Sequence, residues 1–464
     1  MNQVLAFCCV TAVVGAAPVL GIIGSGVAGS SAAHFVREAL GDAVEIIVWE
    51  RNDVVGGRAR SVDVGTGRGG ATTAVDGGAT AISSLNEYLV NITTEAKLAR
   101  RGGAGPDYLG IWDGSAFRFL SKEDSLPLGA RLVARYGLAP AKVLPILREC
   151  VGNLSKIYAL QRGGATFETP RAMLEALGLY DLTQVSAYDF FAAAGVPARF
   201  VDEFVDGASR DNYNQAGTMN AFADLVSLAG AALDGDVFEL ANGTVQIPEY
   251  LLAQSRADVR LGANVAEVRR LEGATGGGYA VQVDGEEEAT RVDALIVATP
   301  LEFTDVALPC DVVRSRPYEE NYVAFAAGVL DEAVFGARAP DLDAVLTVET
   351  EDVPFSCIGA HGRFDGNTVY KFMSRARLTD AAIDTFFSKR ASDVARVDWN
   401  KTGAYAKLAP TPGDEWPPFV LAPDGLFYAN MESPVSCMET EIIAAKNAAL
   451  LAAARLREAS GNWS

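Results

Sequence analysis

The sequence predicts an α/β fold that opens with a Rossmann-like unit. The apolar segment VLGIIG is typical of a short buried parallel strand, and Gly24–Gly29 follows it with the spacing G-x-G-x-x-G. SSAAHFVREAL is typical of a helix, and VEIIVWE is typical of a second strand that ends at Glu50. Strand, glycine loop, helix, second strand and terminal acid therefore occur in the order of a dinucleotide-binding unit.

The glycine loop predicts where a pyrophosphate binds. Gly24 permits the tight turn, Gly26 lets the backbone approach the pyrophosphate, and Gly29 allows the helix to pack closely on the strand. The helix N-terminus directs its positive dipole end at the phosphates. Glu50 follows Gly29 by 21 residues, the position of an acid that accepts hydrogen bonds from a ribose. The remaining predicted contacts of this loop and strand end are Ser25, Ala28 and Arg51.

Two further glycine pairs favour FAD over NAD. Gly56-Gly57-Arg58 comes shortly after Glu50, where flavoenzymes of the glutathione-reductase/amine-oxidase type pass close to the phosphate–ribitol arm. The arginine can pair with phosphates. Gly77-Gly78-Ala79 is typical of a segment beside the isoalloxazine. Glycine pairs also mark ordinary turns, but here the three clusters occur in the order of an FAD site.

Segments far along the chain are expected to complete the FAD domain. Three strand-like stretches end in Val297-Ala298-Thr299-Pro300, and the backbone near Val265 is expected beside the adenine. The segment GLFYANMES contains Glu432 and precedes an amphipathic helix that starts near Met438. Both are expected to close over the ribityl chain and pyrimidine end of FAD, although an ordinary packing helix gives the same pattern.

The middle of the chain is expected to form a substrate domain. Residues 121–238 carry apolar residues at helical spacing, Thr169-Pro170 is typical of a helix start, and Pro140 and Pro145 predict breaks. The predicted fold is thus a Rossmann-like FAD-binding domain of the glutathione-reductase/amine-oxidase type with an inserted, largely helical α+β substrate domain. The FAD domain takes residues 18–120, 239–310 and 401–464, and the substrate domain takes residues 121–238 and 311–400.

Composition excludes several classes of function. The chain has 39 Lys and Arg against 59 Asp and Glu, a net charge of −20, which disfavours nucleic acid as a partner. It has two histidines, so neither a Ser-His-Asp hydrolase nor a zinc site has a supporting motif. The six cysteines include no C-x-x-C pair, and no metal site is expected.

The N-terminus predicts entry into the secretory pathway. VLAFCCVTAVVGAA is an apolar run that ends in small residues, so residues 1–17 are expected to be a cleaved signal peptide, with a signal anchor as the alternative. No other segment is long and apolar enough to span a bilayer. Five N-x-S/T sequons agree with a glycoprotein: Asn91, Asn153, Asn242, Asn400 and Asn462.

Several stretches resemble the prenylcysteine oxidase (prenylcysteine lyase) family. They are GSGVAGSSAAHFVRE, ERNDVVGGRARSV, RFVDEFVDGASRDNYNQAGTMNAFADLVSLAGA, DALIVATPLEF and LFYANMESPVSCMETEIIAAKNAALL. The resemblance covers roughly residues 20–310 and 400–455 and is weak between about 311 and 399. The His34-Phe35 pair and the SLAGA segment near Ser227 are more specific than the FAD motifs, which many flavoenzymes share.

The resemblance implies an FAD-dependent thioether oxidase located in the lysosome or secreted. Members cleave S-farnesyl- or S-geranylgeranyl-cysteine with O2 and water to cysteine, the isoprenoid aldehyde and H2O2, in the degradation of prenylated proteins. It identifies no catalytic side chain. Arg210 or Tyr213 is expected to anchor the amino-acid end of the substrate, against the alternative that both only cap a helix end. Two other functions stay open: an FAD-dependent amine or amino-acid oxidase of the same fold, and a non-enzymatic secreted lipid-binding homologue.

One loop departs from the family pattern. In FELANGTVQIPEYL, Asn242 stands where a flavin-proximal glycine pair has its first glycine. Either its sequon carries no glycan, or the loop is more exposed than in the family.

Overall fold

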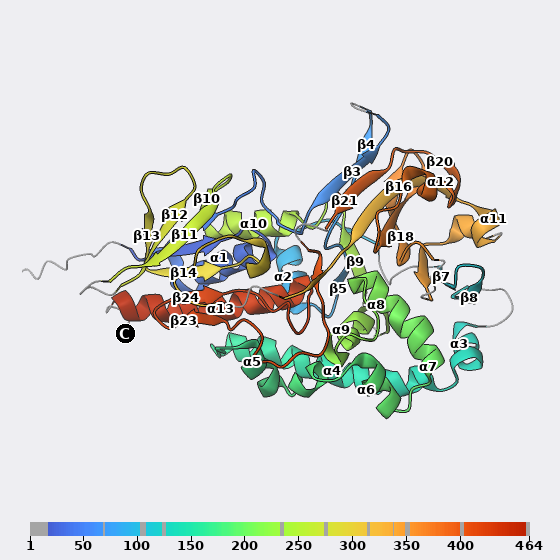
Figure 1. The fold of residues 1–464 in the computed structure, drawn as a ribbon, viewed down its shortest axis with the longest axis horizontal. Helices are drawn as coiled ribbons and strands as arrows, with labels where there is room; N and C mark the ends of the chain where they lie inside the picture. The colour runs from blue at the N-terminus through green and yellow to red at the C-terminus, as the bar shows by residue number, and fades with distance from the viewer. Residues whose placement is uncertain are drawn as a thin grey trace, which may run out of the picture.

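The computed structural model describes residues 17–67, 70–102, 108–122, 127–232, 236–272, 277–312, 316–336, 338–348, 353–399 and 403–460. Nearly all of the predicted signal peptide, and the sequons at Asn400 and Asn462, lie outside these ranges. Figure 1 shows two sheets side by side, with the chain crossing between them several times. No helix among the described residues is long and apolar enough to cross a membrane.

The first sheet has six strands in the order β10-β2-β1-β14-β24-β23. All neighbours are parallel except the last pair. The central strands β1, β2 and β14 are rich in Val, Ile and Leu because both faces of the sheet are covered there, and β14 is buried at every position. Their bounds are β1 (Val19–Ile23), β2 (Glu45–Trp49), β10 (Asp258–Arg260), β14 (Ala294–Val297), β23 (Val420–Ala422) and β24 (Leu426–Tyr428).

Three helices pack against one another beside this sheet. The helix α1 (Val27–Leu40) contacts both α10 (Gln246–Ser255) and α13 (Met438–Ser460) (Figure 1). A helix from early in the chain therefore packs against the C-terminal helix. A separate sheet of β11 (Val265–Arg270), β12 (Tyr279–Val283) and β13 (Thr290–Val292) supplies a second, smaller core. This arrangement confirms the predicted Rossmann-like α/β fold.

The second large sheet has the order β20-β16-β19-β18-β17-β7-β8, with β21 also paired to β16. β7 and β8 come from a segment that we assigned to the FAD domain, yet they pair with strands of residues 311–400. The strands are β7 (Leu109–Trp112), β8 (Phe117–Leu120), β16 (Tyr322–Leu330), β17 (Ala344–Thr347), β18 (Cys357–Phe364), β19 (Asn367–Ser374), β20 (Phe387–Arg390) and β21 (Ala395–Asp398). The short helices α11 (Glu332–Phe335) and α12 (Asp380–Asp384) connect some of them.

A layer of helices lies below this sheet in Figure 1. Thr169 caps α5 by accepting a hydrogen bond from the Ala172 N–H (3.1 Å), with Pro170 at the first helical position as expected. Pro145, however, lies inside α4 rather than ending it, because packing of the flanking turns maintains one long helix. The helices are α3 (Leu128–Tyr136), α4 (Ala139–Arg162), α5 (Pro170–Leu177), α6 (Ala187–Ala193), α7 (Ala198–Phe200), α8 (Asp206–Tyr213) and α9 (Ala221–Ala232), with a π-turn at Val201–Val205.

Small elements join the two halves. The hairpin of β3 (Ser61–Gly65) and β4 (Thr72–Asp76) projects at the top of Figure 1. β9 (Val237–Leu240) pairs with β5 (Ile82–Ser83) and β6 (Arg100–Arg101), and β15 (Tyr318–Glu319) pairs with β22 (Tyr405–Ala406). The helix α2 (Glu87–Glu95) contacts α13. Among the described cysteines, Cys150, Cys310, Cys357 and Cys437 form no disulfide with one another.

Candidate cofactor and substrate site

A cavity of about 380 Å³ lies at the carboxyl ends of β1, β2 and β14. β1 lies between β2 and β14, so the strand order reverses at β1. Open α/β sheets bind ligands at the carboxyl ends of the strands where the order reverses. The cavity extends to β16 and β19 of the second sheet. Both sheets therefore contribute to one site.

The glycine loop is held tightly against the sheet. Gly24 has φ +102° and its N–H donates to the Trp49 carbonyl (2.8 Å), a conformation that few other residues adopt. A side chain on Gly29 would overlap the Gly24 carbonyl oxygen. A Cβ on Gly26, by contrast, would meet no protein atom closer than the Gly56 carbonyl oxygen at 3.7 Å. The fold thus requires glycine at Gly24 and Gly29, whereas the space beside Gly26 is left for a ligand.

Glu50 is fixed at the cavity wall by four hydrogen bonds. Its carboxylate accepts from the Ser25 N–H (3.0 Å) and hydroxyl (2.7 Å), and from the Asn52 N–H (2.9 Å) and side-chain amide (2.6 Å). The side chain is buried but lines the cavity. Ala28, Arg51 and Val265 also line it, and Arg51 donates to the Phe303 carbonyl (2.8 Å). An ionised carboxylate held in this way is suited to accept hydrogen bonds from ribose hydroxyls.

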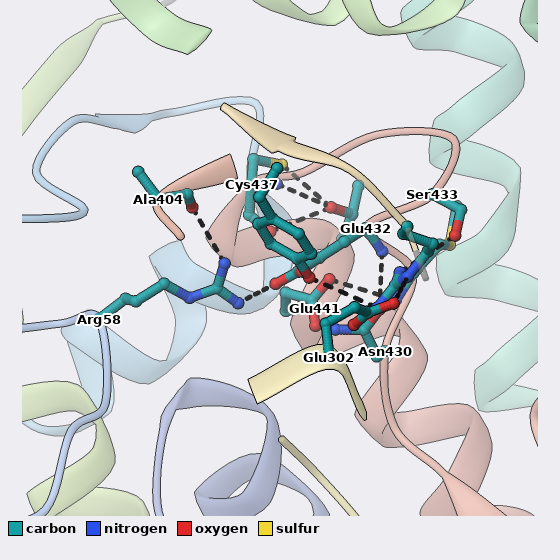
Figure 2. Close-up of polar contacts among 12 residues, drawn as sticks. Arg58, Glu302, Ala404, Asn430, Glu432, Ser433, Cys437 and Glu441 are labelled. Carbon is teal, nitrogen blue, oxygen red and sulfur yellow. Dashed lines mark hydrogen bonds and ion pairs between the residues drawn. The ribbon is translucent and has the colours of Figure 1, made fainter. Parts of the chain in front are cut away.

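The second glycine pair touches the first. Gly56 and Gly57 both have positive φ, and Gly56 forms a parallel bridge with Gly26. Arg58 then lines the cavity, where one guanidinium nitrogen donates to the Ala404 carbonyl (3.0 Å) and another pairs with Glu432 (Figure 2). Glu432 itself is fully buried outside the cavity lining. Through this ion pair Glu432 holds the Arg58 guanidinium in place. Direct contact of Glu432 with a cofactor stays a prediction.

The third glycine pair is enclosed by the chain. A side chain on Gly78 would overlap the Arg58 carbonyl oxygen, and one on Gly77 would come within 2.7 Å of Val397. The Trp399 indole donates to the Gly77 carbonyl (3.0 Å). Gly77, Gly78 and Ala79 all line the cavity, as does Trp399.

Asn242 is exposed and lies outside the cavity lining. Its neighbour Gly243 makes the close approach, because a Cβ there would overlap the Ser61 hydroxyl. Thr244 donates to the buried Asp76 carboxylate through its N–H (3.0 Å) and hydroxyl (3.2 Å). The sequence left two alternatives for Asn242: a sequon without a glycan, or a loop more exposed than in the family. The structure favours the exposed loop.

The start of α13 closes the other end of the cavity. Cys437, Met438 and Glu441 line it. Burial raises the pKa of Glu441 to about 7. Glu439 points elsewhere: it accepts from the Tyr88 and Leu89 N–H groups (2.8 and 3.0 Å) and so caps α2.

A buried ionic network braces this end (Figure 2). Arg316 donates to both oxygens of Glu302 (2.6 and 2.8 Å). It also contacts Asn430 (3.2 Å) and Ser433 (3.0 Å), which belong to the loop before α13. The network ties residues 302–318 to that loop.

Comparisons with known proteins agree with this architecture. A family model described as prenylcysteine lyase matches residues 120–462, and a model of a NAD(P)-binding Rossmann-like domain matches residues 22–93. The chain belongs to the prenylcysteine lyase family. The match runs through residues 311–399, where the resemblance noted from the sequence is weak.

Named relatives of this prenylcysteine lyase family member are similar over almost their whole length. Farnesylcysteine lyase of Arabidopsis thaliana is 29% identical over 94% of this chain and 88% of the relative. Prenylcysteine oxidase 1 of Homo sapiens is 27% identical over 93% of this chain and 88% of the relative. The predicted family and the class, an oxidoreductase, are confirmed.

Solved structures show the same fold. Cyclohexylamine oxidase from Brevibacterium oxydans IH-35A matches with a TM-score of 0.60 at 16% identity, covering 95% of this chain and 99% of that one. Wild-type putrescine oxidase bound to putrescine matches with a TM-score of 0.60 at 15% identity, covering 93% and 98%. The family member thus has the amine-oxidase type of flavoprotein fold that the glycine clusters predict.

The sequence missed the cavity residues of the second half of the chain. Val323 on β16 and Lys371 and Met373 on β19 line the cavity on one face of the sheet. Tyr405 lines it from β22. Among these residues, Lys371 could have been noticed in the sequence, because a lysine interrupts the run VYKFM of mostly apolar residues. Its ammonium lies 3.4 Å from the Gly78 carbonyl and 3.3 Å from the Thr80 hydroxyl.

Arg210 and Tyr213 do not line the cavity. Arg210 is buried, donates to the Thr347 carbonyl and lies 3.8 Å from Asp206. Tyr213 packs edge-on against Tyr405, with ring centroids 5.6 Å apart. Both lie behind the cavity wall, and direct contact with a substrate stays a prediction.

Proposed function

We propose that the protein is an FAD-dependent oxidase that cleaves the thioether of S-prenyl-L-cysteine. The carrying observation is the shared cavity, which runs from the glycine loop to the inner face of the eight-stranded sheet. The reaction consumes the thioether, O2 and water and releases cysteine, an isoprenoid aldehyde and H2O2. The substrate class follows from the family and from the names of its relatives.

The residues present fit FAD. Open space beside Gly26, glycine pairs at Gly57 and Gly78, and the fixed carboxylate of Glu50 supply backbone access for a pyrophosphate and an acceptor for a ribose. Arg58 and the N-terminus of α13 supply positive charge. When bound, FAD supplies the two-electron oxidation of the carbon beside the sulfur and the transfer of those electrons to O2.

The chain's own residues orient the substrate and exclude water. Val323, Met373 and Tyr405 line the cavity and form a largely apolar wall on the substrate side. No histidine lines the cavity among the described residues. Orientation against the cofactor suits a reaction whose cation is stabilised by the substrate's own sulfur and double bond.

An amine oxidase is the second candidate, and Lys371 is the observation that favours it. Amine oxidases of this fold usually pair a lysine-bound water with an aromatic cage. Here Tyr405 and Trp399 line the cavity together with Lys371. The family and the names of its relatives favour the thioether over an amine.

Anaerobic mixing of the purified protein with S-farnesyl-L-cysteine tests the proposal. The visible flavin band should bleach, then return with formation of H2O2 when air enters. A band that S-farnesyl-L-cysteine leaves unchanged but a primary amine bleaches would establish the amine oxidase instead. A protein that purifies without any flavin would favour the non-enzymatic lipid-binding alternative.

We further propose that the protein enters the secretory pathway and is glycosylated, with the lysosome or the extracellular space as its destination. Asn91 and Asn242 are exposed, which supports both sequons as acceptor sites. After expression in a eukaryotic secretory host, enzymatic removal of N-glycans should lower the mass, and Asn91→Gln and Asn242→Gln should each remove part of the difference. A mass that does not change on deglycosylation would contradict the proposal.

A further inference from the structure

The helix α8 lies on the same face of the eight-stranded sheet as the cavity. A Cβ on Gly207 would come within 3.2 Å of Leu346, so the helix approaches β17 closely at this point. Leu346 is paired with Cys357, and Cys357 is paired with Met373 of the cavity wall. Residues paired directly across a ladder point to the same side of the sheet, so all three side chains face α8.

Asp211 is one helical turn beyond Gly207 and therefore faces the same way. It is exposed, whereas its neighbour Arg210 is only 2% exposed. At the end of the helix, Asn214 accepts from the Ser356 hydroxyl (2.5 Å) and donates to the Glu320 carbonyl (3.1 Å). Asp211 thus projects from the side of α8 that faces the sheet, at a point that solvent reaches.

The charge of Asp211 reaches cavity residues. Burial raises the pKa of the Cys357 thiol, the adjacent Asp211 carboxylate raises it further, and Lys371 opposes the rise. Burial also raises the pKa of Tyr405 to about 12, with Asp211 as the next cause. Asp211 and Lys371 therefore both lie close to Cys357.

Asp211 and Lys371 approach the same stretch of the sheet with opposite charges. Lys371 is the diagonal neighbour of Cys357 across the ladder, so these two residues lie roughly 7–8 Å apart. The described hydrogen bonds of Lys371 use two of its three N–H donors. Asp211 can thus accept hydrogen bonds from an ammonium group, and Lys371 can donate to a carboxylate, near the apolar wall that contains Met373.

We propose that Asp211 and Lys371 form a subsite for an α-amino-acid zwitterion, in which Asp211 binds the ammonium and Lys371 the carboxylate. This assignment rests on the proposed function and extends it: the cysteine end of the substrate docks here, and the prenyl chain continues along the apolar wall. Charge-assisted hydrogen bonds to both charged groups give the subsite its selectivity for free amino acids.

Binding of non-allylic thioethers to the flavin-loaded protein tests the subsite without turnover. The probes are S-dodecyl-L-cysteine, 3-(dodecylthio)propionate, which lacks the ammonium, and 2-(dodecylthio)ethylamine, which lacks the carboxylate; each Kd is measured by calorimetry. Asp211→Asn should weaken S-dodecyl-L-cysteine about 10- to 100-fold and leave the propionate unchanged. Lys371→Met should weaken S-dodecyl-L-cysteine and the propionate and leave the ethylamine unchanged.

Asp202→Asn is the matched control, because Asp202 is an exposed acid on the segment just before α8. It should change no Kd by more than about twofold, and circular dichroism checks that all variants fold. If Asp211→Asn weakens the cysteine and propionate probes equally, or weakens neither, the subsite is wrong. Binding of these probes does not require their oxidation. The Kd values therefore test the subsite even if the protein does not catalyse the proposed reaction.

Discussion

Gly26→Leu should leave the protein folded and remove its flavin. Gly26 has φ −70° and ψ −171°, an extended conformation open to any residue. A Cβ there meets no protein atom within 3.7 Å, so the leucine side chain extends into the cavity instead of the core. The leucine side chain would occupy the space in which the pyrophosphate of the cofactor lies against this backbone. Because neither group can move away, flavin retention should fall at least tenfold.

The ratio of visible flavin absorption to protein absorption measures the loss, and circular dichroism reports the fold. Gly29→Ala is the contrasting variant: its Cβ overlaps the Gly24 carbonyl, so it should damage the fold as well as the site. If Gly26→Leu keeps a full complement of flavin, the pyrophosphate does not lie at this loop.

Arg316→Met should destabilise the protein by about 3–5 kcal/mol, because it leaves Glu302 as an uncompensated buried charge. The side chains of Arg316 and Glu302 are only 9% and 6% exposed, so water cannot replace the lost partner. Asn430 and Ser433 lose a donor at the same time. Urea unfolding at equal flavin occupancy gives the difference in the free energy of unfolding.

Two controls separate burial from charge. Arg171→Met breaks a pair in which Arg171 and Glu175 are 46% and 49% exposed, so it should leave the midpoint of urea unfolding nearly unchanged. The double variant Arg316→Met/Glu302→Leu removes both charges and should recover part of the loss. A loss below about 1 kcal/mol for Arg316→Met would show that the network does not brace the loop before α13.

The FAD half of the site could be predicted because its signals are local. Gly24, Gly26 and Gly29 act within one turn between a strand and a helix, so their spacing alone specifies the geometry. Glu50 is placed by the end of the next strand. The contacts of Glu432 could not be foreseen, because its partner Arg58 is 374 residues away in the sequence.

The substrate half depends on pairing between distant strands and on helix packing. Lys371 reaches the cavity because β19 pairs with β16 in one register, and a shift of one residue would turn its side chain to the other face. Likewise, β7 and β8 join the second sheet through a parallel pairing with β17, which no local pattern specifies. Arg210 stands out in the sequence, yet the rotation of α8 on the sheet exposes Asp211 instead.

The sequence by itself thus determined the Rossmann-like unit, the family, and the turns and caps whose partners lie within a few residues, such as Thr169 at the start of α5. Only the tertiary structure decided which side chains of the second sheet line the cavity and which side of α8 faces that sheet. The physical reason is that a glycine's conformational freedom or a helix cap acts over a few residues. Strand register and helix rotation are set by the burial of apolar surface contributed by the whole chain.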